Sequence, residues 1–209
     1  MILRMSETEP IQSQPPPDPL RIISFSDNVL SVAITLLVFN VGVPGDWKQL
    51  DLHRAVLVLL PRLFSYVLSF AVIGVYWVAH NNMFRAATQF NRRLMWINNL
   101  FLMTICLVPG AAALLGSYHG QFAAVFLYGI NLIAVGVSMR FLCFYMVRLH
   151  AKTETPIDPG FVKIGNRRIE TGLVMAVLGV SSAFVNPWIS YVIYSLTPIT
   201  FAWSQILPA

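Results

Sequence analysis

The chain has 209 residues, of which 56% are hydrophobic and only 11% are charged, and its formal net charge is +5. So few charges could not solvate a water-soluble domain with this much apolar surface, so the composition indicates a membrane protein with several spans. Because no basic stretch is interleaved with aromatic residues, we expect no nucleic-acid partner and read the Lys and Arg residues as signals of orientation.

The first twenty residues are rich in proline and contain no apolar stretch of the kind found in a secretory leader. We expect residues 1–20 to form a mobile cytoplasmic tail. The remainder of the chain, residues 21–209, is predicted to form one transmembrane domain.

Six apolar segments follow the tail in chain order. We expect helices at about residues 21–43, 56–79, 94–115, 122–147, 171–185 and 188–206. The pair Pro109-Gly110 should break the third helix, residues 148–168 should form a polar loop, and Pro198 should kink the sixth helix. The segments show no internal repeat. The fold prediction is therefore an all-α membrane protein with six transmembrane helices in each subunit.

The distribution of basic residues predicts how these helices cross the membrane. If the N-terminus is cytoplasmic, ten Lys and Arg residues fall on the inner side and three, Lys48, Arg54 and Arg62, on the outer side. Arg140 lies inside the fourth helix, where it can extend its side chain toward the inner interface. The bias predicts a multi-pass protein with both termini in the cytoplasm.

The first apolar helix carries a polar stripe along its length. At about 100° per residue, the side chains that fall on this stripe are Arg21, Ser24, Asn28, Ser31, Val32, Thr35, Phe39 and Gly42. A hydroxyl and amide stripe gains nothing in lipid unless it meets protein or water. The stripe therefore indicates either a contact between helices or a wall of an aqueous path, with Val32, Leu36 and Phe39 as its narrow points.

A second group of polar residues is expected at one depth, near the inner ends of the first three helices. Asp27 is a carboxylate inside an apolar span, and a buried carboxylate is costly without partners. The residues predicted to form this inner polar cluster are Arg21, Phe25, Ser26, Asp27, Trp77, His80, Asn98 and Asn99.

Two interpretations of the inner polar cluster remain open. It either holds the first helix at a fixed angle, or Asp27 and His80 form a proton relay or cation site. The structural interpretation is favoured because a relay must continue across the membrane, and the middles of these helices supply only Asn131 and scattered hydroxyls. No metalloprotease or nucleophile-elbow motif is present, so we predict no enzyme activity, no cofactor and no fixed metal ion.

The start of the first helix resembles a known family. The sequence RIISFSD, followed by NVLSVAITLLVFNV, is similar to the R-x-x-x-F-S-D motif and following helix of the animal lysosomal potassium channel and its bacterial relatives. The residues that match this first-helix motif are Arg21, Phe25, Ser26, Asp27, Ala33, Thr35, Leu36 and Leu37. The resemblance continues through Trp77, His80, the pair Asn99-Leu100 and Pro109, and so covers the first three helices.

This resemblance implies a cation channel that prefers potassium over sodium, in the inner membrane of a bacterium. A chain with a single six-helix unit would form a homotetramer, with the first helix of each subunit lining the pore. The family has no re-entrant loop with a carbonyl filter. Its constrictions are rings of apolar side chains, which correspond here to Val32, Leu36 and Phe39, with Thr35 as a hydroxyl ring and with Asn28 and Ser31 on the same face. Potassium ions would pass through without a fixed site.

Three residues depart from the family pattern. Asn28 stands where many relatives have Gly, Val32 where Ile or Leu is usual, and Phe39 where Leu is usual. A shorter Val32 should widen the inner ring, and Phe39 should narrow the outer one.

Two functions of other classes remain as alternatives to a channel. A proton-coupled or cation-coupled secondary transporter would use Asp27 and His80, but it would normally show an internal repeat. A non-conducting membrane scaffold would use the polar stripe only for contacts between helices. A flux measurement separates them, because a channel passes current without a coupled ion.

Overall fold

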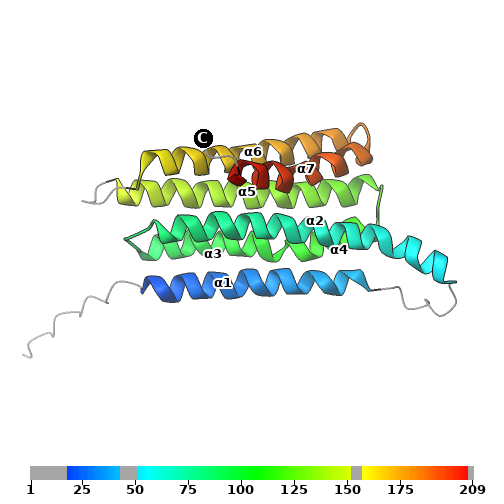
Figure 1. Ribbon diagram of the computed structural model, residues 1–209, viewed down its shortest axis with the longest axis horizontal. Helices are drawn as coiled ribbons and strands as arrows, with labels where there is room; N and C mark the ends of the chain where they lie inside the picture. Colours follow the sequence, from blue (N-terminus) through cyan, green and yellow to red (C-terminus); the bar gives the residue numbers. More distant parts are fainter. Residues whose placement is uncertain (1–17, 43–50, 152–156, 207–209) are drawn as a thin grey trace, which may run out of the picture.

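The computed structural model describes residues 18–42, 51–151 and 157–206, with side chains as far as Phe201. Within these ranges the chain forms helices and no strands. The elements in chain order are α1 (Pro19–Leu36), the 3₁₀ helix η1 (Leu37–Val41), α2 (Leu52–Arg85), α3 (Arg92–Cys106), α4 (Val108–Ser117), α5 (Phe122–His150), α6 (Pro159–Ala183) and α7 (Pro187–Ile206). Since α1 continues into η1 and α3 into α4, the elements form six helical segments along one elongated bundle (Figure 1). The prediction of an all-α, six-helix fold is confirmed.

Aspartate side chains cap the starts of α1, α2 and α6, and each of these helices begins earlier than the apolar pattern predicted. Two of these caps are followed by a proline. Asp18 accepts a hydrogen bond from the backbone of Leu20, and Asp158 accepts one from the backbone of Phe161. The proline lies in the first turn of each of these two helices, where the missing N–H costs nothing. The predicted polar loop at residues 148–168 is therefore wrong over most of its length, since α5 extends to His150 and α6 begins at Pro159.

The break in the third length of the bundle also lies earlier than expected. The chain leaves α3 at Leu107, and Pro109 falls in the first turn of α4 instead of ending a helix. A proline in that position needs no hydrogen-bond partner, so the helix restarts there. The prediction of a break at Pro109-Gly110 was close, but the interruption precedes the proline.

Within the described residues, length and composition identify four stretches that could cross a membrane. They are Pro19–Val41, Leu52–Arg85, Arg92–Ser117 and Phe122–His150. α6 and α7 are also long, at 25 and 20 residues, but charged residues in α6 and polar residues in α7 make them less apolar. Both pack along the apolar lengths of the bundle, and the protein is a multi-pass membrane protein.

The helices are arranged so that α1 lies at one edge of the bundle and α6 and α7 lie at the other (Figure 1). α1 packs against α2 and α3, while α5 packs against α3 and α6. The start of α1, the end of α2, the start of α3, the end of α5 and the start of α6 all lie at one end of the bundle. This arrangement leaves one side of α1 without a covering helix among the described residues.

At the opposite edge, two glycines make room for Tyr194 between α5, α6 and α7. A Cβ atom at Gly179 would lie 2.0 Å from a ring carbon of Tyr194, and one at Gly129 would lie 2.1 Å from its hydroxyl oxygen. Tyr194 is fully buried, and its hydroxyl donates to the carbonyl of Val125 at 3.3 Å.

Because the Tyr194 ring cannot move aside, we expect Gly179→Leu to lower the free energy of unfolding by about 1–3 kcal/mol, the usual cost of overfilling a packed core. Thermal unfolding of the purified protein, followed by loss of the folded peak in size-exclusion chromatography, measures the change. Gly74→Leu is the matched control, because a Cβ at Gly74 meets nothing within 4 Å. Equal unfolding temperatures for the two variants would contradict this account of the packing.

Candidate functional site

α1 has a packed face and an uncovered face. Ile22, Ser26, Leu30 and Ala33 are buried and recur every three or four residues, which places them on one stripe of the helix. On the opposite face Asn28, Ser31, Val32, Thr35 and Phe39 of the polar stripe are all exposed within the subunit, and so is Leu36 at the edge of the stripe. Among the described residues, the stripe is therefore not used for a contact between helices of the same subunit.

The three predicted narrow points are among the more exposed apolar side chains of α1 and η1. Val32 is 56% exposed, Leu36 44% and Phe39 78%. The hydroxyl of Thr35, which lies between them along the helix, donates back to the carbonyl of Val32 at 2.9 Å. This bond leaves the lone pairs of the Thr35 oxygen directed away from the helix, where they can accept hydrogen bonds from water or contact a cation.

The change from α1 to η1 alters the direction of the outermost side chains. A 3₁₀ helix turns about 120° per residue instead of about 100°. The angle between the side chains of Leu37 and Phe39 is therefore about 120°, compared with about 160° in a regular α-helix. The two side chains have different environments, because Leu37 is fully buried and Phe39 is exposed.

Two contacts that the sequence did not predict hold η1 in place. The side-chain amide of Asn40 donates to the carbonyl of Pro109 at 2.8 Å, and the guanidinium of Arg62 donates to the carbonyl of Gly42. Pro109 lies in the first turn of α4, directly after the break at Leu107. For the Asn40 contact, the only signal in the sequence was an asparagine at the end of an apolar span, because an amide in apolar surroundings is costly without a hydrogen-bond partner.

At the other end of α1, a chain of hydrogen bonds joins three helices. His80 Nε2 donates to Asn98 Oδ1 at 2.8 Å, because an amide oxygen can only accept, and Asn98 Nδ2 donates to Ser26 Oγ at 2.8 Å. Ser26 in turn donates to the carbonyl of Ile22 at 3.0 Å. His80, Asn98 and Ser26 are each at most 1% exposed. The bonds tie α1 to α2 through α3, and rings of Phe84 and Phe101 stack on the imidazole at 4.1 and 5.5 Å.

Asp27 is hydrogen-bonded to another residue of the predicted inner polar cluster. The indole N–H of Trp77 donates to Asp27 Oδ1 at 3.0 Å. No hydrogen bond joins Asp27 to Arg21, His80 or Asn98 in the part of the chain that the structure describes. The predicted inner polar cluster therefore contains two separate connections from α1, one through Asp27 and one through Ser26, so the Asp27–His80 pair required by a proton relay is not hydrogen-bonded.

The other three residues predicted for this cluster lie at its surface. Arg21, Phe25 and Asn99 are exposed, and together with Asn98 they line a hollow of about 450 Å³ between α1 and α3. Hydrogen bonds inside the described part of the subunit do not explain why these three residues match the family pattern. They lie on a surface of α1 and α3 that a second subunit could cover.

Two further polar groups within the spans are used elsewhere. Asn131 donates to the carbonyl of Thr104 at 3.1 Å, and Thr104 and Ser138 share a hydrogen bond at 3.0 Å between α3 and α5. Arg140 lies 3.7 Å from the carboxylate of Glu170 on α6, so it is paired, and the expected extension toward the interface is not needed. In the described ranges, no group of three His, Cys, Asp or Glu side chains could hold a metal ion.

Comparisons with known proteins support the resemblance seen in the first three helices. The family model described as the endosomal/lysosomal potassium channel TMEM175 matches residues 21–109, from the start of the R-x-x-x-F-S-D motif to Pro109. A protein of Streptomyces collinus named as a potassium channel is 28% identical over 190 residues, covering 89% of this chain and 92% of the relative. The human protein named as the endosomal/lysosomal proton channel TMEM175 is 28% identical over 126 residues, 60% of this chain and 25% of the human protein.

Solved structures agree with the fold. The crystal structure of a lysosomal potassium-selective channel TMEM175 homolog from Chamaesiphon minutus matches with a TM-score of 0.79 at 27% identity, covering 88% of this chain and 96% of that one. The structure of the potassium channel MtTMEM175 matches with a TM-score of 0.59 at 16% identity, which supports the fold alone. These relatives are named as channels, which agrees with the prediction that this chain is not an enzyme. The predicted resemblance is confirmed.

Proposed function

Because this chain is a relative of the TMEM175 channels, we propose that it is a potassium-permeable cation channel with a preference for potassium over sodium. Four subunits would surround one pore, with α1 and η1 of each subunit as its lining. The observation that carries this proposal is the uncovered polar face of α1. Asn28, Ser31 and Thr35 present amide and hydroxyl groups on a face that no described helix of the subunit covers.

The position of this face supports a pore more than a lipid contact. Polar side chains directed at hydrocarbon would lose their hydrogen bonds to water without replacement. One such helix cannot enclose a channel, so the face needs copies of itself around an axis. A tetramer places four polar stripes toward a shared aqueous centre and leaves the apolar lengths of α2 and α5 for lipid and for neighbouring subunits.

Conduction would be controlled by the apolar rings at Val32, Leu36 and Phe39. A cation that passes a ring of apolar side chains loses part of its hydration shell without gaining oxygen ligands, so a narrow ring can also empty of water and close. The Thr35 hydroxyls between these rings would offer oxygen atoms at the depth where the barrier is steepest. Asn28 and Ser31 would keep the wider inner part of the path hydrated.

The inner polar cluster would set the angle at which α1 approaches the pore axis. Its bonds from Ser26 and Asp27 run to α2 and α3 on the packed side of α1, away from the polar stripe. We therefore assign these residues a structural role and not a role in carrying protons. The exposed residues of this cluster, Arg21, Phe25 and Asn99, would lie at the contact between subunits.

We further propose that the protein lies in the inner membrane of a bacterium with both termini in the cytoplasm. Arg85, Arg92, Arg93 and Arg148 are exposed at the end of the bundle where α1 begins. An excess of basic residues at one end of a membrane protein marks its cytoplasmic side. Fusion of a reporter that is active only in the cytoplasm to either terminus tests this orientation.

The experiment that tests the proposed function is a planar-bilayer recording from the purified protein. With potassium on one side and sodium on the other, the reversal potential should show a higher permeability for potassium, and current should flow without any coupled ion. A pH gradient applied in the absence of potassium measures proton current separately. A protein that transports potassium only when a proton gradient is present would be a coupled transporter, and a silent bilayer would favour the scaffold alternative.

The same preparation should have the mass of a tetramer. Mass photometry or chemical cross-linking in detergent provides this measurement, because a pore lined by one helix from each subunit requires several subunits around an axis. A stable monomer or dimer that still conducts would place the ion path within a subunit and contradict the assignment of α1 as its lining.

Asn40 offers a test of how η1 is held. We expect Asn40→Leu to remove the bond to the Pro109 carbonyl, lower the free energy of unfolding by about 1 kcal/mol, and change single-channel conductance by moving the adjacent Phe39. Asn40→Gln can restore a donor and should recover part of the effect. Val38→Leu, at an exposed neighbouring residue, controls for the gain of side-chain volume. Conductance that is unchanged by Asn40→Leu would show that η1 holds its position without this bond.

A further inference from the structure

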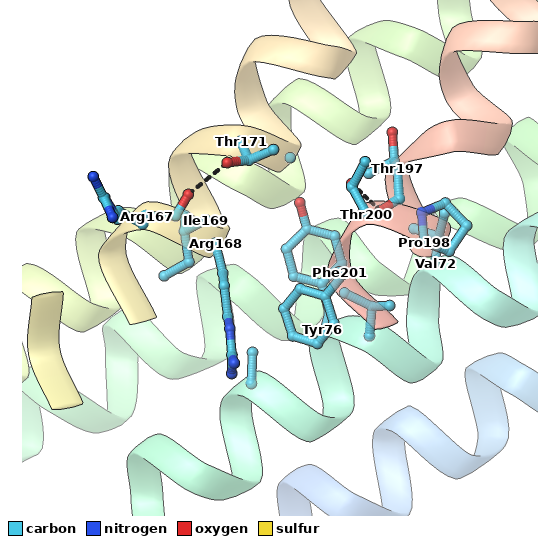
Figure 2. A pocket seen from close by; sticks show the side chains of 13 residues that line it. Val72, Tyr76, Arg167, Arg168, Ile169, Thr171, Thr197, Pro198, Thr200 and Phe201 are labelled. Carbon is cyan, nitrogen blue, oxygen red and sulfur yellow. Dashed lines mark hydrogen bonds between the residues drawn. The ribbon is translucent and has the colours of Figure 1, made fainter. Parts of the chain in front are cut away.

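A groove lies between α2, α6 and α7, on the far side of the bundle from α1. It encloses a cavity of about 140 Å³. Figure 2 shows Tyr76 of α2 in the middle of this groove, with Arg167 and Arg168 of α6 on one side and Thr197 and Pro198 of α7 on the other. A second cavity, of about 360 Å³, shares Arg168 and Phe201 as part of its wall.

Two arginines contribute to the walls of the groove. Arg167 and Arg168 line the first cavity, and among the described residues no acidic side chain lines either cavity. Glu170 lies near them in the sequence, but its carboxylate is paired with Arg140 of α5 at 3.7 Å. The guanidinium of Arg168 lies over the ring of Phe201, 5.5 Å from its centroid, which keeps its charge at the groove.

Tyr76 adds an independent observation. Its side chain is more than nine-tenths buried, at 8% exposed, and it lines the cavity. Its hydroxyl makes no hydrogen bond to any other residue within the described ranges, so it can donate to a group that enters the cavity. A hydroxyl donor beside two arginines points to an acceptor group with negative charge.

The depth of the groove in the membrane indicates that the negatively charged acceptor belongs to a lipid. α6 carries charged residues only up to Glu170 and is uncharged from Thr171 to Ala183. Arg167 and Arg168 therefore lie at the boundary between the apolar length of the helix and its polar start. That boundary is the level of lipid headgroups, and basic pockets between helices at this level bind anionic lipids.

We propose that the groove between α2, α6 and α7 binds an anionic phospholipid of the surrounding bilayer, with its phosphate at Arg167, Arg168 and the hydroxyl of Tyr76. The apolar side chains of Val72 and Pro198 would contact the first part of an acyl chain. The rest of the lipid would lie in the bilayer beside the groove. This site is separate from the proposed pore, and its test does not depend on conduction.

The test is native mass spectrometry of the purified full-length protein in detergent with equal amounts of phosphatidylglycerol and phosphatidylcholine. The wild type should retain phosphatidylglycerol in preference. Replacing both arginines, Arg167→Gln with Arg168→Gln, should weaken that binding about fivefold or more, the factor expected for loss of one or more basic side chains at an anionic surface. Tyr76→Phe should weaken it without changing the charge. Arg148→Gln, an exposed arginine at the same end of the bundle, is the control and should bind normally.

The double arginine variant could lose lipid binding because it folds poorly, so a second variant tests the groove with both arginines in place. A Cβ at Gly172 would lie 3.8 Å from the Tyr76 hydroxyl and 4.0 Å from Thr197, so Gly172→Leu should extend into the groove and displace the lipid. Gly74→Leu is its control. Equal retention of the two lipids by the wild type, equal losses in Arg148→Gln and the double arginine variant, or normal binding by Gly172→Leu would each overturn the proposal.

Discussion

Replacing Phe39 by alanine should raise the potassium current several-fold and bring the potassium-to-sodium permeability ratio closer to one. Phe39 is the most exposed of the three narrow-point side chains, at 78%, and it follows directly on the buried Leu37 and the exposed Val38 in η1. In the proposed tetramer, four phenylalanine rings around one axis would leave little room for a hydrated cation, so the energetic cost of removing water would be greatest there. Single-channel recording with a bi-ionic reversal potential measures both quantities.

Three further variants locate the barrier along α1. Val32→Ala should change conductance less than Phe39→Ala does, because valine already leaves a wider ring. Thr35→Val keeps nearly the same shape but removes the hydroxyl, so it should lower potassium preference without blocking current. Leu37→Val is the control on the packed face, and the smaller replacement is chosen because Leu37 is fully buried and alanine there would leave a cavity. A current that responds to Leu37→Val but not to Phe39→Ala would place the pore on the opposite face of α1.

Replacing Asn98 by leucine should prevent the subunit from folding stably and should abolish the proposed tetramer. Asn98 bonds to both His80 and Ser26 inside a fully packed region. Leucine would leave the His80 nitrogen buried without an acceptor, at about 1–3 kcal/mol, and would remove the bond to Ser26, at about 1 kcal/mol. Such a loss is a large part of the stability of most proteins. Thermal unfolding and the yield of tetramer in size-exclusion chromatography measure it.

Two neighbouring variants separate this effect from a general loss of polarity. Asn99→Leu changes the same residue type one position along α3, but Asn99 is exposed, so the subunit should remain stable. Asp27→Asn should be milder than Asn98→Leu, because an asparagine oxygen can still accept the hydrogen bond from the Trp77 indole. If Asp27→Asn were as damaging as Asn98→Leu, the charge of Asp27 would have a role that its contact with Trp77 does not explain.

Composition and helical periodicity were sufficient to predict the class of the protein and the exposed face of α1. Apolar runs long enough for a bilayer are visible in composition alone, and helical periodicity places Asn28, Thr35 and Phe39 on one face, because side chains recur at a fixed angle along a helix. Those three residues are exposed together in the structure. Helix ends were less well predicted where a cap and a proline act before the apolar run begins, as Asp158 and Pro159 do for α6.

The tertiary structure alone decided which polar residues bond to one another. The sequence places Asp27, His80 and Asn98 at a similar depth, but depth along parallel helices does not specify which side chains face each other. Packing of α1 against both α2 and α3 brings Ser26 to Asn98 and Asp27 to Trp77. Contacts between Asn40 and Pro109, and between Arg140 and Glu170, likewise join residues whose separation in the chain carries no periodic signal. Periodicity is a property of one helix, whereas a hydrogen bond between helices depends on the rotation and height of both.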